Sequence, residues 1–518
     1  MAAVLVCIGG CTFYDLHDHP KADLSKQLNK TVVVHFDKVR IDLKQVQVGP
    51  AGITGVVAST LLSSDEPDEN IHKSITSRDQ SLEAHIYLDS LAISRIENGT
   101  TLQIPFTAVH SVKLYDVNAA RTTMSYVAIG AGITAVAVAI ILLATKQSCP
   151  FIYAYDGSAF DFAGEIYSGA IYPNLERHDY LPLYSIKPVD GKYSLQITNE
   201  VKEIQHTNVM ELCIVDHPAD TRVLFDRNGT LVTLGTLQQA ISCIAPNHKD
   251  VTDLTNAVDS LTYTTNETRP DQVMDSLVFT FNRAPAAHTA KLLVRAKNLF
   301  WLDYVYGRFL DLFGDKIKAW NASRQRIPRE KILEWCRKQG LLLVASIDEG
   351  KGWRPVDYCD EVGPMALRDL VIPMTLNGPP DKTIRVKLEF GARFWEIDYA
   401  AIDYSALQPV TVTTSPAISA IDEKGANILD KIKSDDREYY DQPDIGDQAT
   451  VRFGVPANRL NAARTVFLHS KGYYDILRNP DGKPDLASLQ RFKRPGEMAR
   501  FANDRLKAIN REINTKGD

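Results

Sequence analysis

Apolar and polar residues alternate with a period of two over much of the first 120 residues. The clearest case is the segment 39–44, in which three aliphatic side chains alternate with three charged ones. Alternation of this kind is typical of a β-strand with one buried face. We therefore predict a small antiparallel β-domain over residues 31–120. Its expected strands cover residues 32–36, 39–44, 46–57, 84–88, 102–106 and 109–115.

Residues 122–145 interrupt this alternation with 24 consecutive uncharged positions, which Arg121 and Lys146 flank. At 1.5 Å per residue, a helix of this length spans the ~30 Å hydrocarbon core of a bilayer. The segment predicts one transmembrane helix. A loose GxGxxA match at residues 130–135 predicts no dinucleotide site, because apolar residues follow it where a βαβ unit is required.

Beyond residue 147 the alternation returns. Two aromatic segments flank Asp156-Gly157, a strong signal for a β-hairpin. Further short alternating segments, separated by turn residues, favour a β-sandwich-like domain over residues 148–295. The other strands expected there lie at 193–198, 209–215, 221–225, 230–234, 276–281 and 291–296.

A helical pattern follows these strands. Apolar residues within 298–320 recur every three or four positions, and Pro328 and Gly340 are placed to begin and end a second helix. Residues 384–390 and 394–399 are expected to pair as a hairpin. The expected fold class is mainly β with helical insertions (α+β). The expected divisions are a helical insertion at 296–340, β segments completing or following the sandwich at 341–415, and a helical and loop C-terminal tail at 416–518.

The N-terminus carries a second membrane signal. A short apolar run ends in small residues just before Cys11, which resembles a bacterial lipobox with Cys11 as the lipidated residue. The basic region usual ahead of such a run is missing, since the first lysine or arginine is Lys21. The alternative is a buried first strand. We expect residues 1–11 to be a lipoprotein signal remnant and residues 12–30 to be a polar tether.

The two membrane signals together raise a question of topology. A lipid on Cys11 and a single crossing at 122–145 would place residues 12–120 and 147–518 on opposite sides of the membrane. One basic residue flanks the predicted helix on each side, so the flanking charges do not decide its orientation. The side on which residues 147–518 lie stays open.

Composition narrows the classes of function. Lys and Arg number 58 against 64 Asp and Glu, a net charge of −6 that argues against a nucleic-acid partner. Hydrophobic residues at 44% and charged residues at 24% fit a globular chain better than a disordered one. The sequence has no HExxH, GxSxG or phosphate-loop motif and no CxxC pair. We therefore predict no catalytic residues.

One predicted strand combines carboxylates with aromatic rings. Glu396 and Asp398 lie two residues apart, so they face the same side of a strand. Paired carboxylates suit acid/base chemistry on a glycan, while Trp395 and Tyr399 offer flat faces for a sugar platform. An ordinary half-buried strand is the alternative. We treat Trp395, Glu396, Asp398 and Tyr399 as a candidate binding site.

A second acidic segment lies at residues 435–447. Carboxylate oxygens at this density suit Ca²⁺, which prefers hard oxygen ligands, although the spacing is not that of an EF-hand. A solvated acidic loop is the alternative, and beyond Ca²⁺ and the lipid on Cys11 we predict no cofactor. The candidate calcium ligands are Asp435, Asp436, Asp441, Asp444 and Asp447.

Several runs of sequence also carry a resemblance. The run SCPFIYAYDGSAFDFAGEIYSGAIYPNLERHDYLPL at 148–183 directly follows the hydrophobic segment. With runs at 195–218, 394–405 and 467–485, it resembles a group of uncharacterised envelope proteins of Bacteroidota and allied bacteria, over most of residues 147–495. The resemblance implies a membrane-associated or lipoprotein setting in a Gram-negative cell envelope, and it brings no catalytic residues.

Together these patterns predict a membrane-anchored cell-envelope protein that acts as a binding or scaffold subunit of a larger membrane complex. Its expected partners are membrane lipid and other envelope or membrane proteins, and no nucleic acid. One alternative is a glycan-acting hydrolase or carbohydrate-binding protein, which needs carboxylates converging in a concave, aromatic-lined pocket. The other is a transmembrane adaptor or sensor, which needs a helix that separates the two soluble parts.

Overall fold

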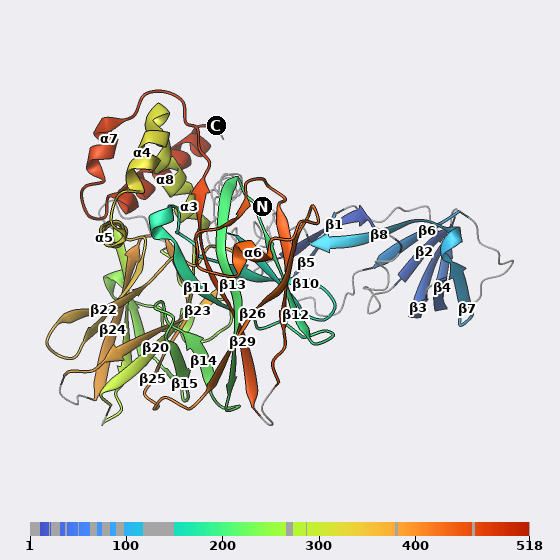
Figure 1. The fold of residues 1–518 in the computed structure, drawn as a ribbon, viewed down its shortest axis with the longest axis horizontal. Helices are drawn as coiled ribbons and strands as arrows, with labels where there is room; N and C mark the ends of the chain where they lie inside the picture. The colour runs from blue at the N-terminus through green and yellow to red at the C-terminus, as the bar shows by residue number, and fades with distance from the viewer. Residues whose placement is uncertain are drawn as a thin grey trace, which may run out of the picture. The chain divides into compact units, whose positions relative to one another are not determined.

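The computed structural model describes residues 11–19, 21, 32–36, 39–49, 51–62, 70–74, 83–89, 98–117, 150–265, 273–285, 287–378, 382–457 and 462–516. The chain divides into two compact units, Met1–Ile141 and Leu142–Asp518. Strands predominate in both units, which confirms the mainly β prediction (Figure 1). Over these described ranges, no helix is both long enough and apolar enough to cross a bilayer. The helix predicted at 122–145 and residues 1–10 of the predicted signal lie outside them.

The described part of the first unit consists of strands β1 (Cys11–Asp18), β2 (Val32–Phe36), β3 (Val39–Gly49), β4 (Gly52–Leu62), β5 (Asn70–Ser74), β6 (Ala84–Leu88), β7 (Thr101–Pro105) and β8 (Val109–Val117). They form one sheet in the order β5-β1-β8-β6-β2-β3-β4-β7, and only β2 and β6 pair in parallel. Alternation along the strands directs Val34, Ile41 and Ile86 into one core, where each is fully buried.

Strand β1 replaces part of the tether predicted over residues 12–30. It pairs with β5 on one side and β8 on the other, so that Tyr14 lies opposite both Ile71 and Val117. A segment without apolar alternation can still join a sheet, because the ladder hydrogen bonds use backbone groups. Both partners are distant in the sequence, so the local pattern did not reveal this pairing.

The largest sheet of the second unit has nine strands: β9 (Phe151–Tyr155), β10 (Phe160–Glu165), β11 (Arg177–Pro182), β12 (Lys192–Thr198), β13 (Glu203–His217), β26 (Thr411–Asp422), β27 (Tyr440–Gln442), β28 (Gln448–Gly454) and β29 (Ala463–Ile476). Their order is β10-β9-β12-β28-β26-β13-β29-β11, and β27 pairs with β13. The hairpin predicted at Asp156-Gly157 joins β9 to β10, with Phe160 opposite Tyr155. This sheet carries most of the residues discussed below.

Three smaller sheets hold the remaining strands of the described part of this unit. Strands β14 (Arg222–Phe225) and β15 (Leu231–Leu234) form a hairpin. A four-stranded sheet has the order β16 (Gln238–Gln239), β25 (Trp395–Asp403), β20 (Thr289–Asn298), β23 (Arg368–Thr375). A six-stranded sheet has the order β18 (Lys249–Asp250), β17 (Ser242–Ala245), β19 (Met274–Asn282), β24 (Thr383–Gly391), β21 (Leu343–Asp348), β22 (Trp353–Cys359).

The hairpin predicted between residues 384–390 and 394–399 is wrong. These residues do form strands, but β24 belongs to the six-stranded sheet and β25 to the four-stranded sheet. The chain turns between them, where the Phe394 N–H donates to the Gly391 carbonyl at 3.0 Å and Arg393 adopts a left-handed φ of 67°. A short connection therefore moves the chain from one sheet to another, and sequence proximity of two strands does not ensure pairing.

The structure also differs from the tail expected over 416–518. Residues up to Ile476 supply most of β26 and all of β27, β28 and β29 to the largest sheet. Strand β29 lies between β13 and β11, and His217 faces Ala463 at one end of its pairing with β13. Polar and charged residues interrupt the period-two alternation of β29, so the sequence pattern did not predict this strand. Helices are limited to α6 (Leu429–Ile432), α7 (Leu486–Arg491) and α8 (Glu497–Lys516) in the described part of this segment.

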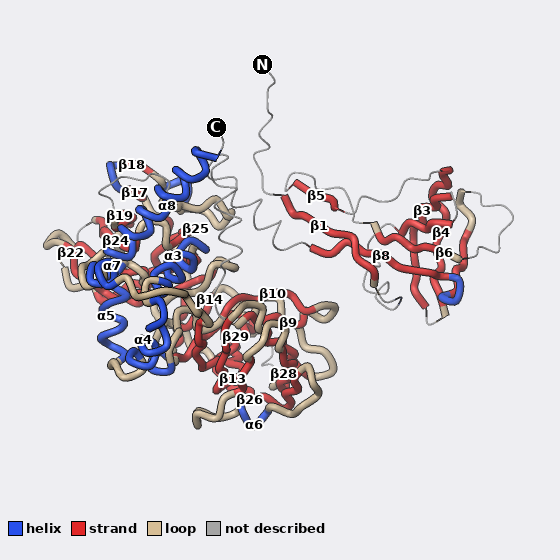
Figure 2. The backbone as a smooth tube through the Cα atoms, turned by 90° about the horizontal axis from the view of Figure 1, so that it is seen from above, coloured by secondary structure: helices blue, strands red, loops and turns tan. Residues whose placement is uncertain are grey.

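The predicted helical insertion is present as α3 (Phe300–Asp311), α4 (Ile317–Arg324) and α5 (Arg329–Gln339). Gly340 ends α5 with a left-handed φ of 78°, as its position in the sequence predicted. These helices and α7 and α8 gather at one end of the unit (Figures 1 and 2). Phe492 joins the two groups, since its ring lies 4.6 Å from that of Phe309 and its carbonyl accepts the Trp335 indole N–H at 3.0 Å.

A buried cluster lies where three of the sheets meet. It includes Cys213 and Phe467 from the nine-stranded sheet, Val223 from the hairpin β14–β15, and Leu293 and Tyr399 from the four-stranded sheet. Packing in this core holds the three sheets against one another, although their strands come from sequence positions far apart.

Candidate functional sites

The residues of the predicted sugar platform are packed inside the protein. Trp395 is fully buried and donates its indole N–H to the Leu341 carbonyl at 2.9 Å. Tyr399 belongs to the buried cluster described above, with 9% of its surface exposed. A ring whose faces are covered by protein offers no surface for stacking on a sugar. The structure therefore differs from the expected platform at both aromatic positions.

The two carboxylates of this strand are held in separate contacts. Asp398 is fully buried, lies 3.1 Å from Arg295 Nε and accepts the Ser260 N–H at 2.9 Å. Burial raises the pKa of Asp398, against the effect of the Ser260 hydrogen bond and the Arg295 charge. Glu396 accepts the Thr262 hydroxyl at 2.6 Å. Neither carboxylate lines the two pockets described below, so the geometry does not favour glycan hydrolysis here.

The five candidate calcium ligands do not converge. Asp435 pairs with Lys471 at 2.6 Å, and Asp436 accepts hydrogen bonds within its own loop. Asp447 accepts the backbone N–H of Asp444 at 2.9 Å. Across the described residues, these carboxylates do not form a set of three at ligand distance from one another.

Asp441 instead helps to hold a histidine. His206 Nδ1 lies 2.6 Å from Asp441, and its Nε2 lies 3.3 Å from Asp475. Burial opposes the charged imidazole, but the hydrogen bonds and charges of the two carboxylates outweigh it and raise the pKa of His206 to about 9. Asp441 is thus committed to an ion pair, which leaves it poorly placed to bind a metal ion.

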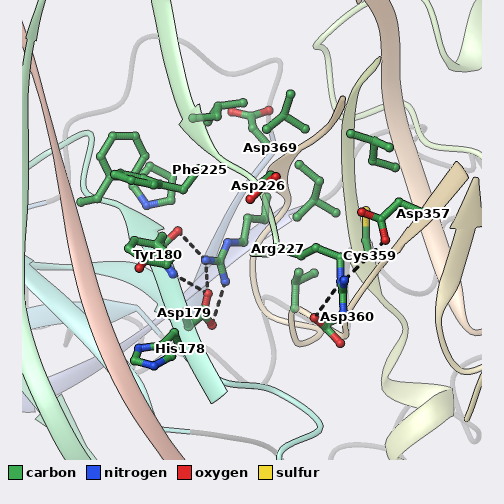
Figure 3. Close-up of a pocket in the computed structure, with 18 of the residues that line it drawn as sticks. His178, Asp179, Tyr180, Phe225, Asp226, Arg227, Asp357, Cys359, Asp360 and Asp369 are labelled. Atoms are coloured by element: carbon green, nitrogen blue, oxygen red, sulfur yellow. Dashed lines mark hydrogen bonds and ion pairs between the residues drawn. The ribbon is translucent and has the colours of Figure 1, made fainter. Parts of the chain in front are cut away.

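A polar pocket lies between β11, the turn of the β14–β15 hairpin, β22 and β23 (Figure 3). It encloses about 650 Å³, part of it open to solvent. Arg227 lies 3.8 Å above the ring of Tyr358, and long contacts of 3.5 and 3.7 Å connect it to Asp357 and Asp360. Figure 3 shows that side chains of opposite charge face one another across this space.

At the base of the polar pocket, arginine and aspartate side chains form ion pairs whose carboxylates are more buried than those near Arg227. Arg368 binds the Asp179 carboxylate and donates to the Tyr180 carbonyl at 2.6 Å. Burial raises the pKa of Asp179, but the charges of Arg368 and Arg177 outweigh burial and lower it. Asp369, with 2% of its side chain exposed, pairs with both Arg222 and Arg295. Because its charges neutralise one another, this pocket mainly ties β11, β14, β20 and β23 together.

A second pocket is largely apolar and lies beneath helices α3 and α5. It encloses about 550 Å³, part of it open to solvent. Strand β29 and the loop between β10 and β11 form its other walls. Its apolar and aromatic lining residues are Ile171, Tyr172, Leu175, Leu302, Tyr306, Ile332, Trp335, Leu341, Tyr474 and Ile476.

Two acidic side chains, Asp303 and Glu361, line this apolar pocket, and Glu361 is the one with a strongly shifted pKa. Among the described residues, its carboxylate has no hydrogen-bond or ion-pair partner. The side chain is partly accessible, yet desolvation by the surrounding protein raises its pKa to about 7, while the charge of Arg177 opposes the shift. A carboxylate in such surroundings lacks the partners that buried charges normally have.

The neighbours of Glu361 explain why it stays unpaired. The Arg177 guanidinium donates to the carbonyls of Ser168 and Glu361 at 2.7 and 2.8 Å, and lies 3.5 Å from Asp360, so its donors are used elsewhere. Gly169, with a φ of 78°, lets the loop approach the carboxyl closely. A Cβ at that glycine would lie 3.1 Å from the carboxyl carbon of Glu361.

Comparisons with known proteins do not assign this chain to a family. No protein-family model and no curated protein matches the chain. The cycloalternan-forming enzyme of Listeria monocytogenes, solved with a pentasaccharide substrate, matches at 10% identity over 71% of this chain and 30% of that chain, with a TM-score of 0.16. An uncharacterised protein of L. monocytogenes EGD-e, solved with glucose, magnesium and calcium, matches at 11% identity, with the same coverage and TM-score.

A structure of Sulfolobus Turreted Icosahedral Virus also matches, at 6% identity over 64% of this chain and 92% of that chain, with a TM-score of 0.13. The chain spans 30% of the length of the two Listeria structures. At TM-scores this low, the three matches support no argument about fold or function.

Sequence reasoning missed Glu361. The residue follows Cys359 and Asp360 in a segment without a motif, and nothing local distinguishes it from any exposed glutamate. Its environment comes from α3, α5, β29 and a loop near residue 169, which only the tertiary structure brings together.

Proposed function

We propose that residues 150–516 form a binding body, rather than an enzyme, that holds a ligand with an apolar part and a cationic head in the apolar pocket. Glu361 is the observation that carries this proposal: it is an acidic side chain without a partner among the described residues, in a pocket lined mainly by apolar and aromatic side chains. The proposal specifies the binding role that the sequence predicts.

The chemistry of the lining sets the class of ligand. An ammonium or guanidinium group would supply the opposite charge that Glu361 lacks, and charge-assisted hydrogen bonds are stronger in a partly desolvated site than in water. The aliphatic and aromatic walls favour an apolar remainder, because its burial releases water from both surfaces. An anionic ligand would place a second negative charge beside Glu361 and is disfavoured.

Decylamine is a suitable probe of this proposal. We expect the full-length protein to bind decylamine with one site per chain, and to bind decanoate far more weakly, in isothermal titration calorimetry at pH 8. Glu361→Gln should weaken decylamine binding by about 10- to 100-fold, because a hydrogen bond to a charged group contributes ~1.5–3 kcal/mol.

Glu330→Gln is the matched control, because Glu330 lies on α5 with its side chain exposed. It removes the same charge from the same region and should leave decylamine affinity unchanged. Equal binding of decylamine and decanoate, or equal affinity in Glu361→Gln and the parent protein, would show that Glu361 does not anchor a cationic head.

The cellular setting is a separate part of the proposal. We propose that this binding body is held at a cell envelope by the lipid on Cys11, the helix at 122–145, or both. Cysteine substitutions at Asp65 and Asp444, labelled with a membrane-impermeant reagent in intact cells and spheroplasts, test the topology. Labelling of both positions from outside the inner membrane supports an envelope binding protein. Labelling from opposite sides would instead favour the transmembrane adaptor.

A further inference from the structure

Three strands of the nine-stranded sheet bring ligand-type side chains onto one face. Glu211 on β13 lies directly opposite His469 on β29, and Cys213 follows two residues after Glu211. Directly paired residues, and residues two apart on a strand, point to the same side of a sheet. On the other side of β29, Tyr180 of β11 faces His469, and His178 follows the same alternation. The sheet register therefore gathers a carboxylate, a thiol and two imidazoles.

The distances within this group are short. One ligand atom each from Glu211, Cys213 and His469 lies within 4.8 Å of the other two. His469 Nδ1 is 2.8 Å from a Glu211 oxygen, and His469 Nε2 is 2.8 Å from His178 Nδ1. In the described part of the chain, no other set of three such side chains meets this condition.

The surroundings orient the imidazole of His469. The ring of Tyr180 stacks on it at 4.6 Å with an interplanar angle of 5°, and Phe225 in turn stacks on Tyr180 at 4.4 Å. His178 and Tyr180 also line the polar pocket, as Figure 3 shows. Cys213 is buried, while Glu211 keeps 28% of its side chain exposed, so an ion could reach the group from the Glu211 side.

A nucleophilic cysteine is a poor explanation of this group. A catalytic thiol needs a base within hydrogen-bond reach, whereas the nitrogens of His469 contact Glu211 and His178 rather than the Cys213 thiol. Burial also raises the pKa of the Cys213 thiol to about 11, which disfavours the thiolate in the absence of a metal ion.

We propose that Glu211, Cys213 and His469 form a binding site for a divalent transition-metal ion of the zinc class. Thiolate sulfur, imidazole nitrogen and carboxylate oxygen are the three ligand types that Zn²⁺ accepts, and three protein ligands leave a fourth position for water. On binding, the Cys213 thiol releases its proton to solvent and the sulfur becomes the metal ligand. The ion takes the place of the contact between His469 Nδ1 and Glu211, and the ring keeps its proton on Nε2. His178 acts as a positioning residue, because its hydrogen bond to His469 selects which nitrogen of that ring faces the ion.

Cobalt(II) is the probe that tests this site, because a cobalt–thiolate bond gives a charge-transfer absorption in the near ultraviolet. We expect the metal-free, full-length protein to bind one Co²⁺ per chain with this absorption, and to lose the absorption when Zn²⁺ is added. Cys213→Ser should abolish the absorption. Cys243→Ser, which alters another buried free cysteine, should retain it.

Glu211→Gln keeps the proposal testable if Cys213→Ser fails to fold, because Glu211 is partly exposed and its change leaves the thiol intact. This variant should keep the absorption and weaken Co²⁺ binding by at least about 10- to 100-fold, which is the loss typical when only a hydrogen-bond partner of a metal ligand is removed. Absence of the absorption in the parent protein, or its persistence in Cys213→Ser, would overturn the proposal. Decylamine binding should be unchanged in both variants, so the metal-site proposal and the apolar-pocket proposal are tested independently of each other.

Discussion

Replacing Glu361 by glutamine is expected to leave stability unchanged near pH 4 and to raise the free energy of unfolding by about 3 kcal/mol near pH 8. The pKa of Glu361 rises from its ordinary value of 4.5 to about 7 in the folded protein, chiefly because of desolvation. Between these values the folded state holds a proton that the unfolded state has lost, so the stability of the parent protein falls as the pH rises from 4.5 to 7. Glutamine carries no charge, so the stability of the variant does not fall over this pH range.

Urea unfolding followed by tryptophan fluorescence measures this effect. All five tryptophans lie between residues 301 and 395, so the signal reports on the second unit alone. The difference in the free energy of unfolding between variant and parent should appear across pH 4.5–7 and stay constant above it. Glu330→Gln should show no such rise. A difference of the same size at pH 4 and pH 8 would mean that the carboxyl of Glu361 is ordinarily solvated.

Truncation of Trp395 to alanine is expected to destabilise the second unit by about 3–5 kcal/mol, which is typical for removal of a large buried aromatic side chain. The indole is fully buried, and the change also deprives the buried Leu341 carbonyl of the N–H that it accepts at 2.9 Å. Both losses act on the folded state only, because the unfolded chain exposes this residue to water in either form.

Trp353→Ala is the control for this change. Trp353 is 37% exposed at the start of β22, with Lys387 4.8 Å from its ring, so its loss should cost at most ~1 kcal/mol. The remaining tryptophans report unfolding in both variants. If Trp395→Ala instead unfolds like the parent protein but weakens binding to an oligosaccharide, the ring serves as the sugar platform that the sequence suggests.

The elements that the sequence determined by itself are those whose signals are local. The hairpin at Asp156-Gly157 and the end of α5 at Gly340 depend on the backbone preferences of residues within a few positions. Period-two alternation likewise located strands such as β3 and β24, because burial of one face needs no knowledge of the partner strand.

Tertiary structure alone decided the pairing of strands and the groups that meet between them. Residues 384–399 contain two correctly predicted strands that nonetheless enter different sheets. Glu211 and His469 are 258 positions apart, and Glu361 is isolated only because elements from four regions of the chain surround it. Partner choice and side-chain surroundings are non-local quantities, and the energy of a buried charge depends on everything packed around it. A local pattern can therefore place a residue on a strand, while its chemistry depends on the fold.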